Sequence, residues 1–512
     1  MQQLTSLDNQ FLAIETPRTY GHVGGLAIYD PSTAPGGDVT HADICRLVSE
    51  RLHLLPPFTR KLVQVPLGLD HPYWIEDPDF DIDFHIRDSA VPPPGDERQL
   101  AHTIERIFSR PLDRTRPLWE LYLIHGLKNG RVALLTKIHH AVVDGVSGAE
   151  ILGTLLDLHP EGREIEPPAG DDKRKPERKP TDLEMLARGV AGLPRQPLRM
   201  IRSIPTTLPN LADLPGVGAI PGAPAASKTL ARAWGMLPGT RNPGVLETTT
   251  ARPPRTPFNG NISAHRTFAF GSLPLDAVKQ LKNELGITVN DVVVSLCATA
   301  VRDWLLDRDA LPEQPLVAMV PVSVRTKEEM GTYGNRVSMM IVPIPTNVED
   351  PRERLLTAHS TLKSAKERHR AVPANLMTDA TSFVPPAVQA LASRLTMQLS
   401  GRLAPPLNLV ISNVPGPREP LYLAGAQLQG HYPVSVITDG VGLNMTVMSY
   451  RDNVDFGLVG DRELMRDAWP LMEGLERSLD ELCEVICKKK RQPKRTQSTN
   501  GSKPHRQPAG TI

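Results

Sequence analysis

The chain has 512 residues, of which 40% are hydrophobic and 22% are charged, and its formal net charge at pH 7 is +1. This length exceeds what a single hydrophobic core normally supports, so at least two cores are expected. The near-zero net charge argues against a protein that attracts nucleic acids through its overall field, and no nucleic-acid partner is predicted.

Cysteine usage and hydropathy exclude several further classes. The four cysteines are scattered, without the spacing of a disulfide framework or a zinc site, and no metal site is predicted. The amino terminus lacks the basic and apolar segments of a signal peptide. No apolar run approaches the ~18 residues that span a bilayer. The protein is therefore expected in the cytoplasm, or peripheral on a membrane.

The first region, residues 1–160, alternates predicted strands and helices. Strands are predicted at 21–29, 119–124 and 131–140, and helices at 41–54, 98–109 and 149–158. A proline-rich interdomain linker follows at 161–257, with a predicted helix at 182–190.

A second α/β region is predicted at 258–487. It carries predicted helices at 275–285, at 288–306 and across 352–400, and predicted strands at 316–324, 336–344, 407–412 and 444–450. The remaining residues, 488–512, are basic and then polar, and are predicted to form a disordered tail.

The most informative segment lies at the end of the strand predicted at 131–140. It contains adjacent histidines, His139 and His140, followed by a turn signal at Asp144-Gly145. Successive side chains on a strand point to opposite faces, so the two histidines cannot both enter one site. Ser147 then begins a capping-box pattern that opens the helix predicted at 149–158.

Three other interpretations of this segment exist. The histidines could be packing residues beside a turn aspartate, and adjacent histidines on opposite faces do not converge on a metal ion. The sequence from Gly145 to Ala149 resembles a nucleophile elbow, but it lacks the final glycine. Ser147 is already assigned to the helix cap, so a serine hydrolase is disfavoured.

The segment from His139 to Gly145 matches the HHxxxDG motif of the bacterial wax ester synthase/diacylglycerol acyltransferase family. The chain resembles that family, and within it the triacylglycerol synthases of actinobacterial type, because further family blocks occur in order over residues 4–485, outside much of the linker. These blocks are Leu7-Asp8 with Phe11-Leu12, His22-Val23-Gly24, Pro111-Leu112-Asp113-Arg114, Pro117-Leu118-Trp119-Glu120, Pro257-Phe258-Asn259-Gly260, Asn290-Asp291 and Ser412-Asn413-Val414-Pro415-Gly416-Pro417. One departure is Thr19-Tyr20 before Gly21-His22, where the family often has Pro-Met.

The resemblance implies a mixed α/β fold of two similar domains, of the chloramphenicol acetyltransferase and condensation-domain type. It also implies an O-acyltransferase that moves a long-chain acyl group from acyl-CoA to diacylglycerol, or to a fatty alcohol as a wax ester synthase. Acyl-CoA would be a cosubstrate, with no bound cofactor, and the enzyme would sit at a membrane or lipid-droplet surface.

The resemblance also assigns roles to single residues. The second motif histidine, His140, is carried over as the general base, and His139 and Asp144 are carried over as supporting residues. The motif positions expected to be structural are Gly145, Asp291, Pro117, Leu118 and Trp119.

The chemistry agrees with these assignments. A thioester is already activated, so the reaction needs mainly a base for the alcohol, and an imidazole with a pKa of ~6.5 suits that task. Asn290 falls in the first turn of a predicted helix, where it could orient the substrate or stabilise an oxyanion. Asp291 could instead be the capping-box partner of Thr288, and Trp119 a core residue.

The sequence does not identify the residues that contact the CoA phosphates, although arginines in the linker are candidates. Those arginines are Arg188, Arg195, Arg199 and Arg202. The same segment could instead rest on a membrane or pack between the domains.

Two other classes of function compete with this one. A condensation-type domain would need a carrier region, which the sequence does not contain, and a non-catalytic homologue would not need an intact histidine motif.

Overall fold

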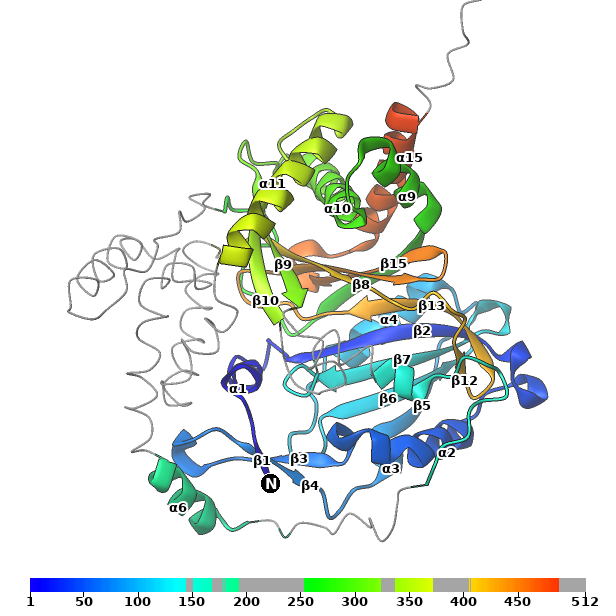
Figure 1. Ribbon diagram of the computed structural model, residues 1–512, viewed down its shortest axis with the longest axis vertical. Helices are drawn as coiled ribbons and strands as arrows, with labels where there is room; N and C mark the ends of the chain where they lie inside the picture. Colours follow the sequence, from blue (N-terminus) through cyan, green and yellow to red (C-terminus); the bar gives the residue numbers. More distant parts are fainter. Residues whose placement is uncertain are drawn as a thin grey trace, which may run out of the picture.

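The computed structural model describes residues 1–143, 151–167, 178, 180–192, 253–323, 337–371, 405 and 407–487. Asp144, Gly145 and Ser147 lie outside the described residues, as do most of the linker and the tail at 488–512. Two six-stranded sheets and one small sheet organise the described chain (Figure 1).

The first large sheet contains the strand that carries the histidines. Its strands are β2 (His22–Asp30), β5 (Ile86–Ala90), β6 (Trp119–His125), β7 (Val132–His139), β12 (Tyr422–Leu423) and β13 (Ala426–Val434). Their order is β12-β13-β2-β7-β6-β5, and β5 pairs with β6 in parallel while the other pairs are antiparallel. A three-stranded sheet beside it contains β1 (Gln2–Gln3), β3 (Arg60–Val63) and β4 (Tyr73–Glu76).

The second large sheet is also mixed. Its strands are β8 (Arg266–Pro274), β9 (Leu316–Ser323), β10 (Val337–Ile344), β11 (Leu409–Val414), β14 (Leu443–Tyr450) and β15 (Asn453–Asp461). Their order is β10-β9-β11-β14-β15-β8, and β11 runs parallel to both of its neighbours. The mixed two-domain α/β fold expected from the sequence is therefore confirmed.

Most of the described α-helices begin at a residue whose side chain caps the helix. The helices are α1 (Ser6–Ala13), α2 (His41–Arg51), α3 (Ile82–His85), α4 (Glu97–Phe108), α6 (Asp182–Gly192), α9 (Leu275–Leu285), α10 (Val289–Leu306), α11 (Pro351–Ala371), α14 (Arg462–Met465) and α15 (Trp469–Cys487). Capping boxes open α1, α2, α4 and α10, which satisfies backbone N–H groups that a helix leaves unpaired. Gly286 adopts φ of 67° just after α9 and ends that helix, as the sequence predicts.

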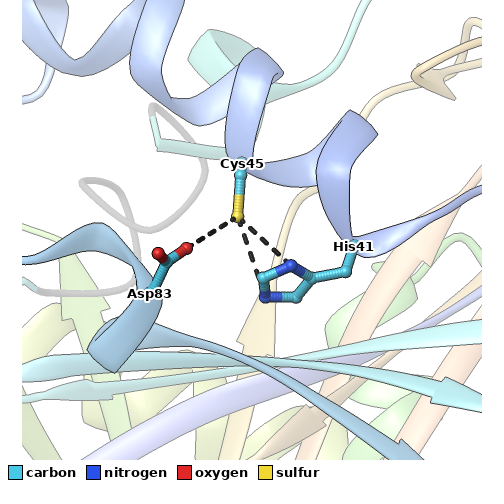
Figure 2. A group of neighbouring side chains, drawn as sticks. All are labelled: His41, Cys45 and Asp83. Atoms are coloured by element: carbon cyan, nitrogen blue, oxygen red, sulfur yellow. Dashed lines mark hydrogen bonds between the residues drawn. The ribbon is translucent and has the colours of Figure 1, made fainter.

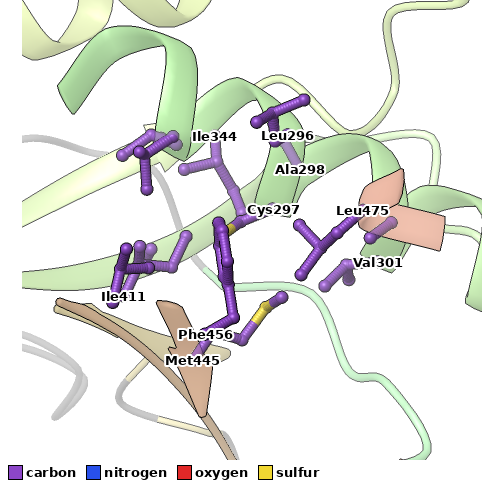
Figure 3. Packing of buried hydrophobic residues seen from close by; sticks show 14 of the residues in the cluster. Leu296, Cys297, Ala298, Val301, Ile344, Ile411, Met445, Phe456 and Leu475 are labelled. Atoms are coloured by element: carbon purple, nitrogen blue, oxygen red, sulfur yellow. The ribbon is translucent and has the colours of Figure 1, made fainter. Parts of the chain in front are cut away.

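Helices α9, α10, α11 and α15 cover the face of the second sheet that is turned away from the first sheet (Figure 1). Helix α10 is almost wholly buried in the resulting core. Figure 3 shows its side chains against both the sheet and α15, with labels on Leu296, Cys297, Ala298, Val301, Ile344, Ile411, Met445, Phe456 and Leu475.

One strand from the second region of the sequence belongs to the sheet of the first domain. Strand β13 comes from the second region, yet it pairs with β2 in the first sheet. Its Pro433 carbonyl lies so close to Gly457 of β15 that a Cβ at Gly457 would approach the oxygen to 1.7 Å. The His431 N–H donates to Asp455 of β15 at 2.9 Å. Strand β13 therefore connects the two sheets.

The predicted strands and helices that lie within the described residues occur in the structure, with small differences at their ends. Among the described residues, no single helix is long and apolar enough to cross a bilayer; α9 and α10 meet the criterion only as a pair bent by 108°.

Candidate active site

Strand β7 presents opposite faces to two different cores. Val132, Leu134 and Ile138 pack in the core of the first domain, whereas Ala133 and Leu135 face a core shared with α4 and the second sheet. The alternation predicted for this strand is confirmed. His139 ends β7 on the shared side, and His140 occupies the turn that follows.

His139 is held by protein groups at both ring nitrogens. The ring is buried, with 1% of the side chain exposed. Its Nδ1 accepts a hydrogen bond from the Ala141 N–H at 3.0 Å, so the neutral ring carries its proton on Nε2. That Nε2 lies 3.1 Å from Oε1 of Glu15. The lone pair of Nδ1 is therefore used within the protein, and Nε2 faces the Glu15 carboxylate without meeting the geometry of a hydrogen bond.

Glu15 is the centre of this arrangement. Its carboxylate accepts hydrogen bonds from the Gly21 N–H at 2.6 Å and from Nε of Arg114 at 3.0 Å. Burial by itself raises the pKa of Glu15, but the contacts with His139, Arg114 and Gly21 outweigh it and lower the pKa to about 2. The carboxylate is thus charged at neutral pH.

Sequence reasoning did not identify Glu15 or assign a role to Arg114. Arg114 lies within a family block, and Glu15 follows Phe11 by four residues, but neither fact assigns the pairing. The two residues are 99 positions apart, so only the fold brings them together.

His140 has a different environment from His139. Its backbone N–H donates to the Gly21 carbonyl at 2.7 Å. Its ring is stacked on Phe11 of α1, with centroids 4.0 Å apart and an interplanar angle of 6°. His140 is only partly buried. The stacking fixes the plane of the ring.

Gly21 allows the two histidines to approach this loop. A Cβ at position 21 would lie 2.6 Å from Nε2 of His139 and 3.1 Å from the Phe11 carbonyl oxygen. Any larger residue must displace the His139 ring or α1. The lack of space for a side chain at position 21 therefore explains the glycine in the Gly21-His22 block.

The Pro117-Leu118-Trp119 block contacts the end of β7 that carries His139. The Leu118 carbonyl accepts the His139 N–H at 2.9 Å. Trp119 is buried, stacks on Phe58 and donates its indole N–H to the Phe58 carbonyl at 2.8 Å. Trp119 occupies a core position, as expected from the sequence.

Two buried basic groups lie on the same face of the sheet as His139. Lys137 donates to the carbonyls of Ile107 and Arg110, at 3.2 and 2.7 Å, and lies 3.5 Å from Glu120. Burial lowers the pKa of Lys137 to about 8, with Glu120 opposing that effect. His22 pairs with His139 across β2 and β7, and burial lowers its pKa well below the ordinary value. His22 is therefore neutral at physiological pH.

Asn290 and Asp291 form a second group, in the other domain. Asp291 completes the capping box with Thr288, as the sequence suggests, and its Oδ2 lies 2.7 Å from Nδ1 of His359. Asn290 stands in the first turn of α10 and accepts a hydrogen bond from Asn413 at 3.3 Å. The blocks containing Asn290 and Asn413 thus meet, although 123 residues separate them.

Sequence models of the family cover most of the chain. The wax ester synthase/diacylglycerol acyltransferase catalytic domain matches residues 4–293, and the C-terminal domain of the same family matches residues 333–483. The chain belongs to this family. Its histidine motif, with the strand that carries it, lies within the catalytic-domain match.

Relatives and solved structures agree with the family. A Mycobacterium tuberculosis protein named "Probable diacyglycerol O-acyltransferase tgs2" is 35% identical over 94% of this chain and 98% of its own length. The Marinobacter aquaeolei wax ester synthase/diacylglycerol acyltransferase superposes with a TM-score of 0.67 at 31% identity, over 95% of this chain and 100% of that one. The first condensation domain of the CDA synthetase matches with a TM-score of 0.54 at 16% identity, over 95% and 96% of the two chains, which shows a shared fold.

The linker arginines are only partly described. Arg188 is exposed on α6, whereas Arg195, Arg199 and Arg202 lie outside the described residues. Met185 fixes α6 against the small sheet, where it packs with Val63, Val65 and Ile75.

One cluster of possible metal ligands, which the cysteine spacing does not suggest, lies away from the histidine motif. His41, Cys45 and Asp83 have possible ligand atoms within 4.8 Å of one another (Figure 2). The Cys45 sulfur lies 3.6 and 3.7 Å from the two nitrogens of His41, so it is not placed along the lone pair of either one. Burial and then Asp83 raise the pKa of Cys45. The protonated thiol and Asp83 form a hydrogen bond of 3.8 Å that joins α2 to α3.

Proposed function

We propose that this protein transfers a long-chain acyl group from acyl-CoA to the free hydroxyl of diacylglycerol, with His140 as the general base. The observation that carries the proposal is the contrast between the two motif histidines. The His139 side chain is buried, with 1% exposed, against Glu15 and the Ala141 backbone, whereas His140 is only partly buried and its ring stacks on Phe11. A base must be within reach of the substrate proton, and His140 is the histidine that meets this condition.

The reaction can be written with few participants. The diacylglycerol hydroxyl oxygen attacks the thioester carbonyl carbon while its proton passes to His140, giving a tetrahedral oxyanion. The carbon–sulfur bond then breaks, and the proton on His140 passes to the departing CoA sulfur. Triacylglycerol and CoA are the products, and no covalent acyl-enzyme is required. Both substrates are bound together when the bond forms.

The supporting groups have separate tasks in this proposal. Glu15 and Arg114 fix His139, whose backbone is continuous with His140, and so hold the strand end in place. Asn290 lies near the positive end of the α10 dipole, where a side-chain or backbone N–H can stabilise the oxyanion. Asp144 is assigned a supporting role from the motif.

Diacylglycerol is the preferred acceptor in this proposal because the mycobacterial relatives, at 35% identity, carry that activity in their names. A fatty alcohol is the second candidate, because the Marinobacter relative is named for both activities. Both acceptors reside in lipid. Helix α6 exposes Leu183 and Val190, and this supports peripheral contact with a membrane or lipid-droplet surface.

To test this proposal, purified protein is incubated with labelled palmitoyl-CoA and either dioleoylglycerol or hexadecanol, and the labelled lipids are then separated. We expect labelled triacylglycerol to form with a higher kcat/KM than hexadecyl palmitate. Preferential formation of the wax ester would favour the second acceptor. The absence of both products would reject the proposed function.

A further inference from the structure

A basic cavity lies beside α4, in a part of the molecule to which the mechanism assigns no task. Its volume is about 540 Å³, and its walls come from α4 and the edge strand β5, with Tyr122 of β6 between them. The lining runs from Asp96 to Arg110, along the whole of a 12-residue helix, which is about 18 Å long.

The cavity holds more positive charge than its own acidic residues neutralise. The acidic residues of the lining, Asp88 and Asp96, already have other partners: Asp96 accepts the Gln99 N–H that caps α4, and Asp88 lies 3.7 Å from His125. Four arginines also line it, namely Arg87, Arg98, Arg106 and Arg110.

Two of these arginines have carboxylate partners and two do not. Arg87 lies 3.3 Å from Glu120, and Arg98 lies 3.5 Å from residues of the second domain. Within the described part of the chain, neither Arg106 nor Arg110 has a carboxylate within ion-pair distance. Guanidinium groups bind phosphate oxygens through paired, charge-assisted hydrogen bonds. The cavity therefore offers two uncompensated cations to a phosphorylated ligand.

Two lining residues of the cavity, Tyr122 and Arg110, are linked to the strand that carries the histidines. The Tyr122 hydroxyl donates to Glu120 at 2.9 Å, and Glu120 lies 3.5 Å from Lys137. Lys137 in turn donates to the Arg110 carbonyl at 2.7 Å. Lys137 precedes His139 by two residues, about 7 Å along β7. The backbone of Arg110 is thus close to the motif end of the sheet.

We propose that this cavity binds the phosphates of the 3′-phospho-ADP part of acyl-CoA, leaving the pantetheine arm to reach the histidine motif. The assignment rests on the proposed function, and it names Arg106 and Arg110 as the residues that bind the nucleotide phosphates. The long pantetheine arm separates these phosphates from the thioester. The cavity therefore contributes to binding of the donor and not to the chemical step.

Steady-state kinetics with two donors test the proposal. Palmitoyl-pantetheine keeps the thioester but lacks every phosphate. In the double variant Arg106→Ala/Arg110→Ala, we expect the KM for palmitoyl-CoA to rise roughly tenfold or more, because two charge-assisted contacts are lost. The KM for palmitoyl-pantetheine should change by less than about twofold on the same reasoning. Replacement of both arginines by lysine should give an intermediate KM for palmitoyl-CoA.

The matched control is Arg46→Ala, because Arg46 is exposed on α2 and pairs only with Asp43 among the described residues. It should leave both KM values at the wild-type level. An equal rise of KM for both donors, or no rise for palmitoyl-CoA, would overturn the assignment. If the wild-type protein uses neither donor, the proposed function fails instead.

The phosphate that the two arginines bind could instead belong to a lipid headgroup. Flotation with vesicles that contain phosphatidate separates the two sources. We expect the double variant to bind these vesicles as the wild type does. Loss of vesicle binding together with an unchanged KM for palmitoyl-CoA would assign the cavity to lipid and contradict the proposal.

Discussion

Replacement of His140 by alanine is expected to lower kcat/KM for acyl transfer by roughly 10²–10⁴-fold, the usual contribution of a general base. The ring of His140 stacks on one face of Phe11, so its removal should leave most packing of the strand end intact. Initial rates with palmitoyl-CoA and dioleoylglycerol measure the effect. Circular dichroism and the melting temperature establish that the variant is folded.

His139→Ala is the matched comparison, since it removes the same side chain one residue earlier. His139 acts through its contacts with Ala141 and Glu15, so a measurable fraction of the activity should remain. A loss for His139→Ala as complete as that for His140→Ala, in folded protein, would contradict the division of roles between the two histidines.

Glu15→Gln is expected to remove a pH-dependent part of the stability. The folded-state pKa of Glu15 is about 2, compared with an ordinary value of 4.5. A lowered carboxyl pKa stabilises the folded state above pH 4.5, and this stabilisation is lost as the pH falls toward about 2. The shift corresponds to on the order of 3 kcal/mol at neutral pH. Chemical denaturation between pH 2 and 7 measures it.

The control for Glu15→Gln is Glu50→Gln, at an exposed position on α2. The free energy of unfolding should fall less steeply below pH 4.5 in Glu15→Gln than in the wild type, while Glu50→Gln follows the wild type. Parallel pH profiles for all three proteins would show that Glu15 is not held as a buried anion. Activity should also fall in Glu15→Gln, because the amide holds His139 less firmly.

Local patterns predicted much of the strand and helix structure around the site. The alternation along β7 separates the side of Leu134 and Ile138 from the side of Leu135, and the structure places these residues in different cores, as two-residue periodicity requires. The pattern Thr288-Val289-Asn290-Asp291 predicted the capping box that begins α10. These features depend on neighbours within a few residues, which the sequence displays directly.

The contacts that organise the site depend on residues far apart in sequence. Nothing local to Glu15 indicates that it meets Arg114 and His139, because a single glutamate after a short helix is ordinary. By its position in the sequence, strand β13 belongs to the second region. Only its pairing with β2 shows that it lies in the first sheet. Pairing partners of this kind are chosen by the packing of whole sheets.

The most direct test of the central claim follows CoA release by wild-type protein from labelled palmitoyl-CoA, with and without dioleoylglycerol. Direct transfer assisted by His140 predicts that CoA appears only when the acceptor is present, in a one-to-one ratio with labelled triacylglycerol. The protein itself should carry no label after denaturation. A burst of CoA equal to the enzyme concentration without acceptor, together with label bound covalently to the protein, would contradict the account.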